Sequence, residues 1–203
     1  MKMIIKSFFK SRSAWLLLGL MWAALLFPVT AAVAEERITV HDFVLYDGDS
    51  REQLVASVRF DYHLTKYLRD SLRNGITLRS ETRFDLMWHS DWWWNKTQTL
   101  DRVVSELKYH ALTGQYQLVN KTTNANWNFS NLATALQQLG RLDKYKLPAL
   151  PESAFTGDAA IYIESRLEPR ASESLGVSAK LAALFSNEKH ELISQGVMWP
   201  LTP

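Results

Sequence analysis

Residues 76–88 read Ile-Thr-Leu-Arg-Ser-Glu-Thr-Arg-Phe-Asp-Leu-Met-Trp and alternate with a period of two. One face carries Ile76, Leu78, Phe84, Leu86 and Trp88, with Ser80 and Thr82 between them. The other face carries Arg79, Glu81, Arg83 and Asp85. This pattern is typical of a β-strand with one buried and one solvated face. The alternating charges predict ion pairs with neighbouring strands rather than general acid–base chemistry.

The same alternation recurs along the chain. It predicts further strands over residues 54–64, 101–111, 116–119, 159–168 and 190–199. Thr113-Gly114 is typical of a tight hairpin turn between two of them. Consecutive strands joined by hairpins or short helices favour antiparallel pairing.

Two segments have helical rather than strand periodicity. In the first, Leu64, Leu68 and Leu72 recur at four-residue spacing between a capping Thr65 and a terminating Gly75. The second is predicted to begin at a capping Ser130 and to end at Gly140. Two helices are too few for a parallel α/β fold. The sequence therefore predicts a β-rich α+β fold: an antiparallel sheet or a β-sandwich with two short helices.

The first 34 residues have the layout of a secretory signal peptide. Four basic residues, Lys2, Lys6, Lys10 and Arg12, precede an uncharged apolar run over residues 14–27. Pro28 ends that run, and Ala32-Val33-Ala34 supplies the small residues of a cleavage site. We expect cleavage after Ala34 and a single β-rich envelope domain over residues 35–203. The alternative is an uncleaved leader that uses residues 14–33 as an inner-membrane anchor.

Composition limits the classes of function. The chain has 23 basic and 21 acidic residues, and four basic ones belong to the leader, so residues 35–203 hold 19 basic and 21 acidic residues. The apparent basicity thus lies in the leader, which argues against a nucleic-acid partner. The chain has no cysteine, which excludes disulfides, thiolate metal sites and thiol nucleophiles. The expected location is the periplasm, or the periplasmic face of the inner membrane if the leader stays attached.

The most unusual local feature is the segment Trp88-His89-Ser90-Asp91-Trp92-Trp93-Trp94-Asn95. Adjacent residues of a strand point to opposite faces, so Trp92, Trp93 and Trp94 cannot all enter one core. Because tryptophan combines large apolar area with a polar N–H, these residues form a candidate interaction surface together with His89 and Asp91. The alternative is that alternate tryptophans are core residues and the others cover a sheet edge.

No motif predicts catalysis, a cofactor or a metal. His89, Ser90 and Asp91 are the residue types of a hydrolytic triad, but such triads are assembled from separate segments. The five histidines show no H-x-H or H-E-x-x-H spacing. His63 and His110 would approach each other only if their strands were neighbours. We therefore expect no enzyme activity, no catalytic residues and no bound cofactor.

The order of the motifs resembles a bacterial family of unknown function whose members are exported or membrane-anchored. The matching stretches are Phe60–Leu64, Arg73–Ile76, Trp92–Trp94, Leu107–Tyr116, the helix after Ser130, and Trp199–Leu201. Asp91 departs from the pattern, because the resemblance leads us to expect a basic residue there. The family is often encoded beside a nitrogen-regulation type sensor histidine kinase, and it has no established activity to transfer.

These observations lead to one preferred function and one alternative. The preferred function is a non-enzymatic interaction or accessory protein whose partner is an envelope or inner-membrane protein, and the resemblance implies a link to a membrane sensor. The alternative is a binding module that takes an apolar or glycan ligand on its tryptophan cluster. A hydrolase with an unrecognised site ranks below both. The sequence does not specify an oligomeric state.

Overall fold

The computed structural model describes residues 37–48, 53–88, 96–155, 158–170 and 190–201. The chain divides into two compact units, residues 1–34 and residues 35–203. All the described residues belong to the second unit, so the fold is that of the second unit alone.

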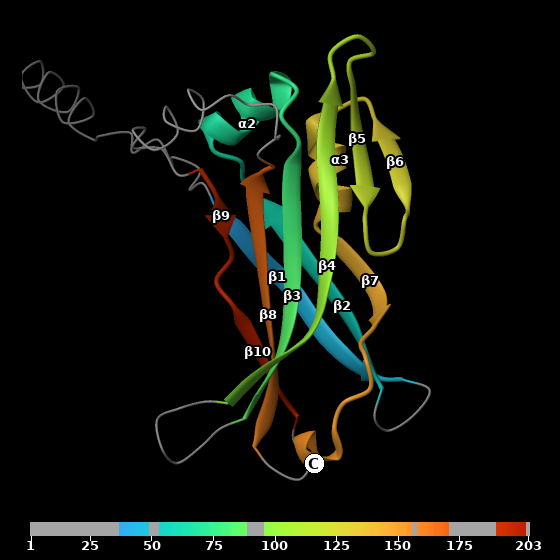
Figure 1. The fold of residues 1–203 in the computed structure, drawn as a ribbon, viewed down its shortest axis with the longest axis vertical. Helices are drawn as coiled ribbons and strands as arrows, with labels where there is room; N and C mark the ends of the chain where they lie inside the picture. The colour runs from blue at the N-terminus through green and yellow to red at the C-terminus, as the bar shows by residue number, and fades with distance from the viewer. Residues whose placement is uncertain (1–36, 49–52, 89–95, 156–157, 171–189, 202–203) are drawn as a thin grey trace, which may run out of the picture. The chain divides into compact units, whose positions relative to one another are not determined.

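The second unit is rich in strands, with two short α-helices and one 3-10 turn among its described residues (Figure 1). The strands are β1 (Ile38–Asp47), β2 (Leu54–Tyr62), β3 (Leu78–Trp88), β4 (Lys96–His110), β5 (Gln115–Asn120), β6 (Asn126–Phe129), β7 (Arg141–Lys146), β8 (Ala159–Pro169), β9 (Leu192–Ile193) and β10 (Val197–Leu201). The helices are α2 (Lys66–Arg73), α3 (Leu132–Leu139) and η1 (Glu152–Ala154). The predicted β-rich α+β class with two short helices is confirmed.

The strands form two antiparallel sheets that pack face to face. The small sheet has the order β1-β2-β7, and the large sheet has the order β10-β8-β3-β4-β5-β6, with β9 also paired to β8. Aromatic rings from both sheets meet between them. Phe84 of β3 stacks on Tyr145 of β7 with ring centroids 5.8 Å apart, and Phe43 of β1 meets Trp199 of β10 edge-on at 6.0 Å. The fold is therefore a sandwich with one core between its sheets.

The core follows the alternation seen in the sequence. In β2, every second side chain is buried against the large sheet, and these residues are Leu54, Ala56, Val58, Phe60 and Tyr62. In β3, Leu78, Phe84 and Leu86 are completely buried. Because the apolar residues of both strands recur with a period of two, they fall on one face of each strand.

Polar residues on the core faces form a hydrogen-bonded cluster that joins the sheets. The Tyr62 hydroxyl lies 2.9 Å from Ser80 Oγ on β3 and 2.8 Å from Ser165 Oγ on β8. The Thr82 hydroxyl also donates to Ser165 Oγ, at 3.3 Å. All four side chains are buried. The cluster explains why serine and threonine stand among the apolar residues of β3, since each buried hydroxyl has a partner.

Both helices carry side-chain caps at their start. Thr65 Oγ1 accepts a hydrogen bond from the Leu68 N–H at 3.0 Å, so the predicted cap of α2 is correct. The predicted cap of α3 is wrong by one residue, because Asn131 Oδ1, not Ser130, accepts from the Thr134 N–H at 2.8 Å. The residue next to the helix, with extended backbone, is the one whose side chain reaches the third amide of the helix.

Several strands differ from the sequence-based expectation. β1, β6 and β7 were not predicted, and β4 begins at Lys96 rather than at residue 101. The predicted strand over residues 190–199 is divided into β9 and β10 by residues 194–196. Three of these differences have a local cause, since register shifts in the pairings of β1 with β2, β7 with β2 and β4 with β3 break the period of two in β1, in β7 and near the start of β4.

Candidate functional site

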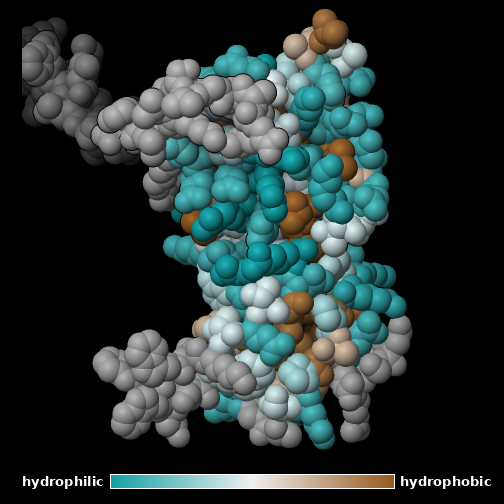
Figure 2. Space-filling model, viewed as in Figure 1, coloured by the Kyte–Doolittle hydropathy of each residue, from teal (hydrophilic) through white to brown (hydrophobic). Residues whose placement is uncertain are grey.

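The outer face of the large sheet carries a regular array of charges on β3 and β8. These two strands pair along their whole length, which places opposite charges across from each other. The facing pairs are Arg79 with Glu168, Glu81 with Arg166, and Arg83 with Glu164. We call these six residues the charged ladder. Hydrophilic residues cover the middle of the face drawn in Figure 2.

Ion pairs link the charged ladder along and across its strands. Glu81 contacts Arg79 at 3.4 Å on its own strand and Arg102 of β4 at 3.5 Å. Arg83 contacts Glu164 of β8 at 3.6 Å. Each of these carboxylates thus has a cationic partner, as the sequence predicted. Partly exposed pairs of this kind stabilise a sheet only modestly, about 0–1 kcal/mol each.

Beyond Arg83 the outer face changes from charged to apolar. Met87 of β3 lies opposite Ala160 of β8, and Ala160 lies opposite Pro200 of β10. Met198 of β10 lies opposite Tyr162 of β8, and it is 61% exposed. We call Met87, Ala160, Met198 and Pro200 the apolar end of the outer face.

Asp85 and Tyr162 stand opposite each other at the border between the two regions. Arg83 Nε donates to Asp85 Oδ2 at 2.7 Å, whereas the buried Asp85 Oδ1 has no hydrogen-bond partner. The Tyr162 hydroxyl donates to Glu164 at 3.1 Å. Burial, followed by this hydrogen bond to Glu164, raises the pKa of Tyr162. At this border the last charges of the ladder are therefore paired, Arg83 with Asp85 and Glu164 with Arg83 and the Tyr162 hydroxyl.

The sequence-predicted interaction residues Trp92, Trp93, Trp94, His89 and Asp91 lie outside the described residues, as does the predicted cleavage site after Ala34. Their position in the chain is nevertheless informative. Residues 89–95 connect the end of β3 to the start of β4. Trp88, the last residue of β3, pairs with Ala159 and donates its Nε1–H to the Ser153 carbonyl at 3.4 Å. The described part of β3 therefore ends at Trp88, directly after Met87 of the apolar end.

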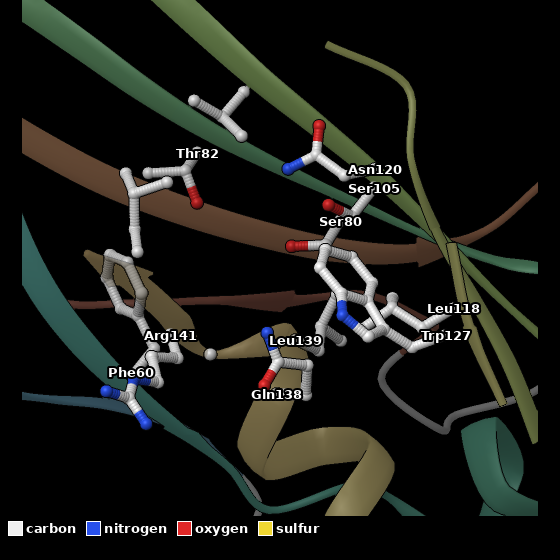
Figure 3. A pocket seen from close by; sticks show the side chains of 13 residues that line it. Phe60, Ser80, Thr82, Ser105, Leu118, Asn120, Trp127, Gln138, Leu139 and Arg141 are labelled. Atoms are coloured by element: carbon white, nitrogen blue, oxygen red, sulfur yellow. The ribbon is translucent and has the colours of Figure 1, made fainter. Parts of the chain in front are cut away.

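A small polar cavity lies between the sheets beside α3 (Figure 3). Polar side chains from three strands and the helix line it: Ser80, Thr82, Ser105, Asn120 and Gln138. The Trp127 ring and Phe60 supply apolar walls. Its volume is about 30 Å³, which suits one or two water molecules and is far below the ~300–1,000 Å³ of typical small-molecule sites. We therefore do not assign it a sugar or lipid ligand.

Histidines and acidic residues are dispersed in the structure. His63 follows β2 of the small sheet, and His110 lies on β4 of the large sheet, where its Nε2 is 2.9 Å from Gln117 Oε1. The two histidines therefore belong to different sheets and are not brought together by strand pairing. Within the described ranges, no group of three or more histidine, aspartate or glutamate residues could hold a metal ion.

Among the described residues, neither helix is long enough and apolar enough to cross a membrane.

Sequence reasoning missed the apolar end because its residues come from three strands. Met87, Ala160 and Met198 are far apart in the chain, and their proximity depends on the pairing of β3, β8 and β10. One signal was available in advance. Pro200 within a strand-like stretch predicts an edge strand, since proline cannot donate a ladder hydrogen bond.

The fold and its outer face define the protein as a β-sandwich domain with a charged ladder and an adjacent apolar surface. The chain belongs to the family described as a domain of unknown function, DUF4390, whose sequence model matches residues 35–189. The match begins directly after the predicted cleavage site and ends before β9 and β10. No curated protein and no solved structure matches the chain.

Proposed function

We propose that this protein is a non-enzymatic interaction or accessory protein of the bacterial envelope, and that its partner is an envelope or inner-membrane protein. The export-type leader supports this location, and so does the start of the family match at residue 35. The resemblance to a family often encoded beside a nitrogen-regulation type sensor histidine kinase makes such a sensor the first partner to test. The proposal involves no nucleic acid and no cofactor.

The observation that carries the proposal is the apolar end of the outer face. Exposed apolar side chains that occur singly are ordinary, but contiguous ones beside a polar border are typical of binding surfaces. Here Met198 is 61% exposed and Pro200 follows it on β10, while the half-buried Ala160 and Met87 continue the row of Pro200 on β8 and β3. The sequence continues from this point into Trp92, Trp93 and Trp94. Methionine and tryptophan are both enriched at protein interfaces.

The charged ladder is consistent with a binding role for the neighbouring surface. Known interfaces combine an apolar centre with a polar, solvated rim. Because Arg79, Glu81 and Arg83 already contact charges within the protein, a partner need not neutralise them. Binding at the apolar end would therefore avoid the desolvation cost of unpaired charges.

The alternative ligand for the same surface is an apolar molecule or a glycan. Tryptophan rings present flat apolar faces together with a polar N–H, which suits both kinds of ligand. The three consecutive tryptophans favour this small-ligand function, whereas the cavity beside α3 does not. A small-ligand binding module requires no partner protein, and this difference from the accessory function can be measured.

Site-specific photo-crosslinking in cells tests the preferred function. A photoreactive residue placed at Met198 or at Trp93 should capture the same envelope protein, and a residue placed at Leu112 should not. Leu112 is a matched control because it is completely exposed on the β4–β5 hairpin. Trp92→Ala, Trp93→Ala and Trp94→Ala should reduce capture from Met198. Unchanged capture in all three variants would remove the tryptophan surface from the proposal.

Tryptophan fluorescence of the purified chain separates the two ligands. A spectral shift on adding envelope glycans or lipid vesicles, abolished by Trp93→Ala, would favour the small-ligand alternative. No shift across the panel, together with a specific crosslinked protein, would favour the accessory role.

Cell fractionation tests the location. The mature chain should be found in the periplasmic fraction with Glu35 at its N-terminus. A full-length chain in the inner-membrane fraction would instead show that the leader is an anchor, and a cytoplasmic chain would contradict the proposed function.

A further inference from the structure

A groove separates the free edges of the two sheets. One wall is the start of β1, from Arg37 to Val40, and the other is formed by β9, β10 and the residues between them. The volume of the groove is about 480 Å³, within the ~300–1,000 Å³ of typical binding sites. We call it the edge groove. It is distinct from the apolar end, and the inference drawn from it does not rest on the proposed function.

Within the part of the chain that the structure describes, Ile38 and Val40 of β1 turn main-chain hydrogen-bonding groups without a partner toward the edge groove. The His63 N–H donates to the Arg37 carbonyl at 2.9 Å, so Arg37 and His63 form a hydrogen-bonded pair. The Phe60 N–H turns away from β1 and donates to the Gly140 carbonyl at 2.8 Å. Since hydrogen-bonded and non-hydrogen-bonded pairs alternate in an antiparallel ladder, Ile38 and Val40 direct their N–H and C=O groups away from β2.

On the opposite wall, the main-chain groups of Ile193 also point to a free edge. The Ser194 N–H donates to the Ser165 carbonyl at 2.8 Å, and Ser194 Oγ accepts from the Ser165 N–H at 2.9 Å. Ser194 thus faces β8, and the preceding Ile193 turns its main-chain groups to the free edge. Within the described ranges, no strand pairs with β1 or β9 on these sides.

Farther along β1 and β10, beyond the edge groove, both strand edges are protected against pairing with another strand. A register shift interrupts β1 between Val40 and Asp42, and Pro200 removes a donor from β10. The Phe43 and Trp199 rings meet edge-on across the gap. Bulges, prolines and covering side chains are common devices by which proteins block unwanted strand addition. The edge groove is the stretch in which these devices are lacking among the described residues.

We infer that the edge groove binds an extended segment of a partner polypeptide, which adds as a strand to β1. Ile38 and Val40 supply main-chain donors and acceptors for such a strand, as in other cases of strand addition. The half-buried Val40 and Val197, together with the buried Ile38 and Leu192, give the groove an apolar lining. A strand in the groove presents every second side chain to this lining, so the segment should carry apolar residues at alternate positions.

A selection experiment with the full chain tests this inference. A phage-displayed library of random linear peptides should yield binders with alternating apolar residues and no central proline. Val40→Pro removes one groove-facing N–H without breaking the β1–β2 ladder, and it should weaken those peptides by roughly tenfold or more. Val40→Ala keeps that N–H and is the matched control, so it should bind nearly as well as the unmodified chain.

A second variant and a structural measurement keep the test decisive if Val40→Pro does not fold. Ile193→Pro removes a donor from the opposite wall and should also weaken binding. In hydrogen exchange, saturating peptide should slow the amides of Ile38, Val40 and Ile193. The inference is overturned if no peptide is selected, or if binders protect other amides or tolerate both prolines. It is also overturned if the chain forms a dimer that Val40→Pro dissociates, because the edge would then pair with a second copy.

Discussion

The Tyr62 hydroxyl shows how one polar group can connect two sheets. It projects from β2 of the small sheet and reaches Ser80 and Ser165 of the large sheet, at 2.9 and 2.8 Å. All three side chains are buried. A hydrogen bond in such a place contributes modestly when made, but losing one partner leaves the others unsatisfied away from water. The cluster therefore favours one alignment of the sheets over others.

Replacing Tyr62 by phenylalanine tests this role. Tyr62→Phe should lower the free energy of unfolding by about 1–3 kcal/mol, because the Ser80 and Ser165 hydroxyls lose a buried partner. Denaturant unfolding monitored by circular dichroism would measure it. Tyr46→Phe is the control, since Tyr46 is 52% exposed, and it should change stability by less than about 0.5 kcal/mol. Equal effects of the two substitutions would show that the buried hydroxyl has no special role.

At the scale of the element, α3 depends on one capping side chain. Asn131 Oδ1 accepts from the Thr134 N–H at 2.8 Å, and the neighbouring Ser130 makes no such contact in α3. Asn131→Ala should therefore lower the free energy of unfolding by about 0.5–2 kcal/mol. Ser130→Ala should leave it within about 0.5 kcal/mol. Thermal unfolding of both variants measures the difference, and a larger loss in Ser130→Ala would reverse the assignment of the cap.

The junction between α3 and β7 requires a glycine for reasons of space. A Cβ added to Gly140 would lie 1.9 Å from the Phe60 carbonyl oxygen, and this neighbour is main chain that cannot rotate away. The same junction contains the hydrogen bond from the Phe60 N–H to the Gly140 carbonyl. The close approach of α3 and β7 to β2 thus depends on the missing side chain.

Gly140→Ala should force β7 away from β2 and lower the free energy of unfolding by about 1–3 kcal/mol. Gln137→Ala, at an exposed position of the same helix, is the control and should have little effect. Denaturant titration gives both values. If Gly140→Ala were as stable as the control, the backbone at this junction would have to be more adaptable than the packing indicates.

At the scale of the whole molecule, two tyrosines hold the sheets together. Tyr62 links β2 to β3 and β8, and the Tyr145 hydroxyl of β7 donates to Asp101 of β4 at 2.6 Å. Burial is the main cause that raises the pKa of each phenol, and the Asp101 carboxylate adds to the effect at Tyr145. Loss of the proton would break the Tyr145 hydrogen bond to the Asp101 carboxylate and would leave a charged phenolate in the buried site of Tyr62.

The stability of the protein should consequently fall at alkaline pH. In the unfolded chain a tyrosine loses its proton near pH 10.0, whereas in the folded protein the raised pKa retains it. The raised pKa therefore contributes fully to the free energy of unfolding below pH 10. This contribution is lost as pH rises toward the pKa of the tyrosine in the folded protein. Tyr62 should lower the free energy of unfolding by up to about 1.4 kcal/mol per pH unit in this range. Tyr145 is more exposed and should add less.

Unfolding free energies measured between pH 8 and pH 11 test this expectation. Tyr62→Phe should show a shallower decline than the unmodified chain, because its contribution no longer titrates. Parallel curves for the two proteins would mean that the decline comes from other groups, such as lysines.

Sequence alone predicted the features that depend on neighbouring residues. The alternation in residues 54–62 and 78–88 is local, and so are the Thr65 cap and the hairpin turn at Gly114, whose φ is +67°. The ion pairs of Glu81 and Asp85 were also predictable, because opposite charges alternated along one strand. The tryptophan surface of Trp92, Trp93 and Trp94 stays a prediction, since those residues lie outside the described ranges.

The tertiary structure decided how residues distant in the chain meet. It divided the strands between two sheets, brought Tyr62 to Ser165, placed Met87 beside Ala160, and left the edges of β1 and β9 facing a groove. Periodicity predicts none of these, because a period of two states which face of a strand is buried but not which strand lies next to it. Bulges in β1 and in the β3–β4 pair also interrupt the period of two, so the alternation could not be recognised at these places. Local patterning thus determined the β-rich class, whereas strand pairing produced the surfaces on which both proposals rest.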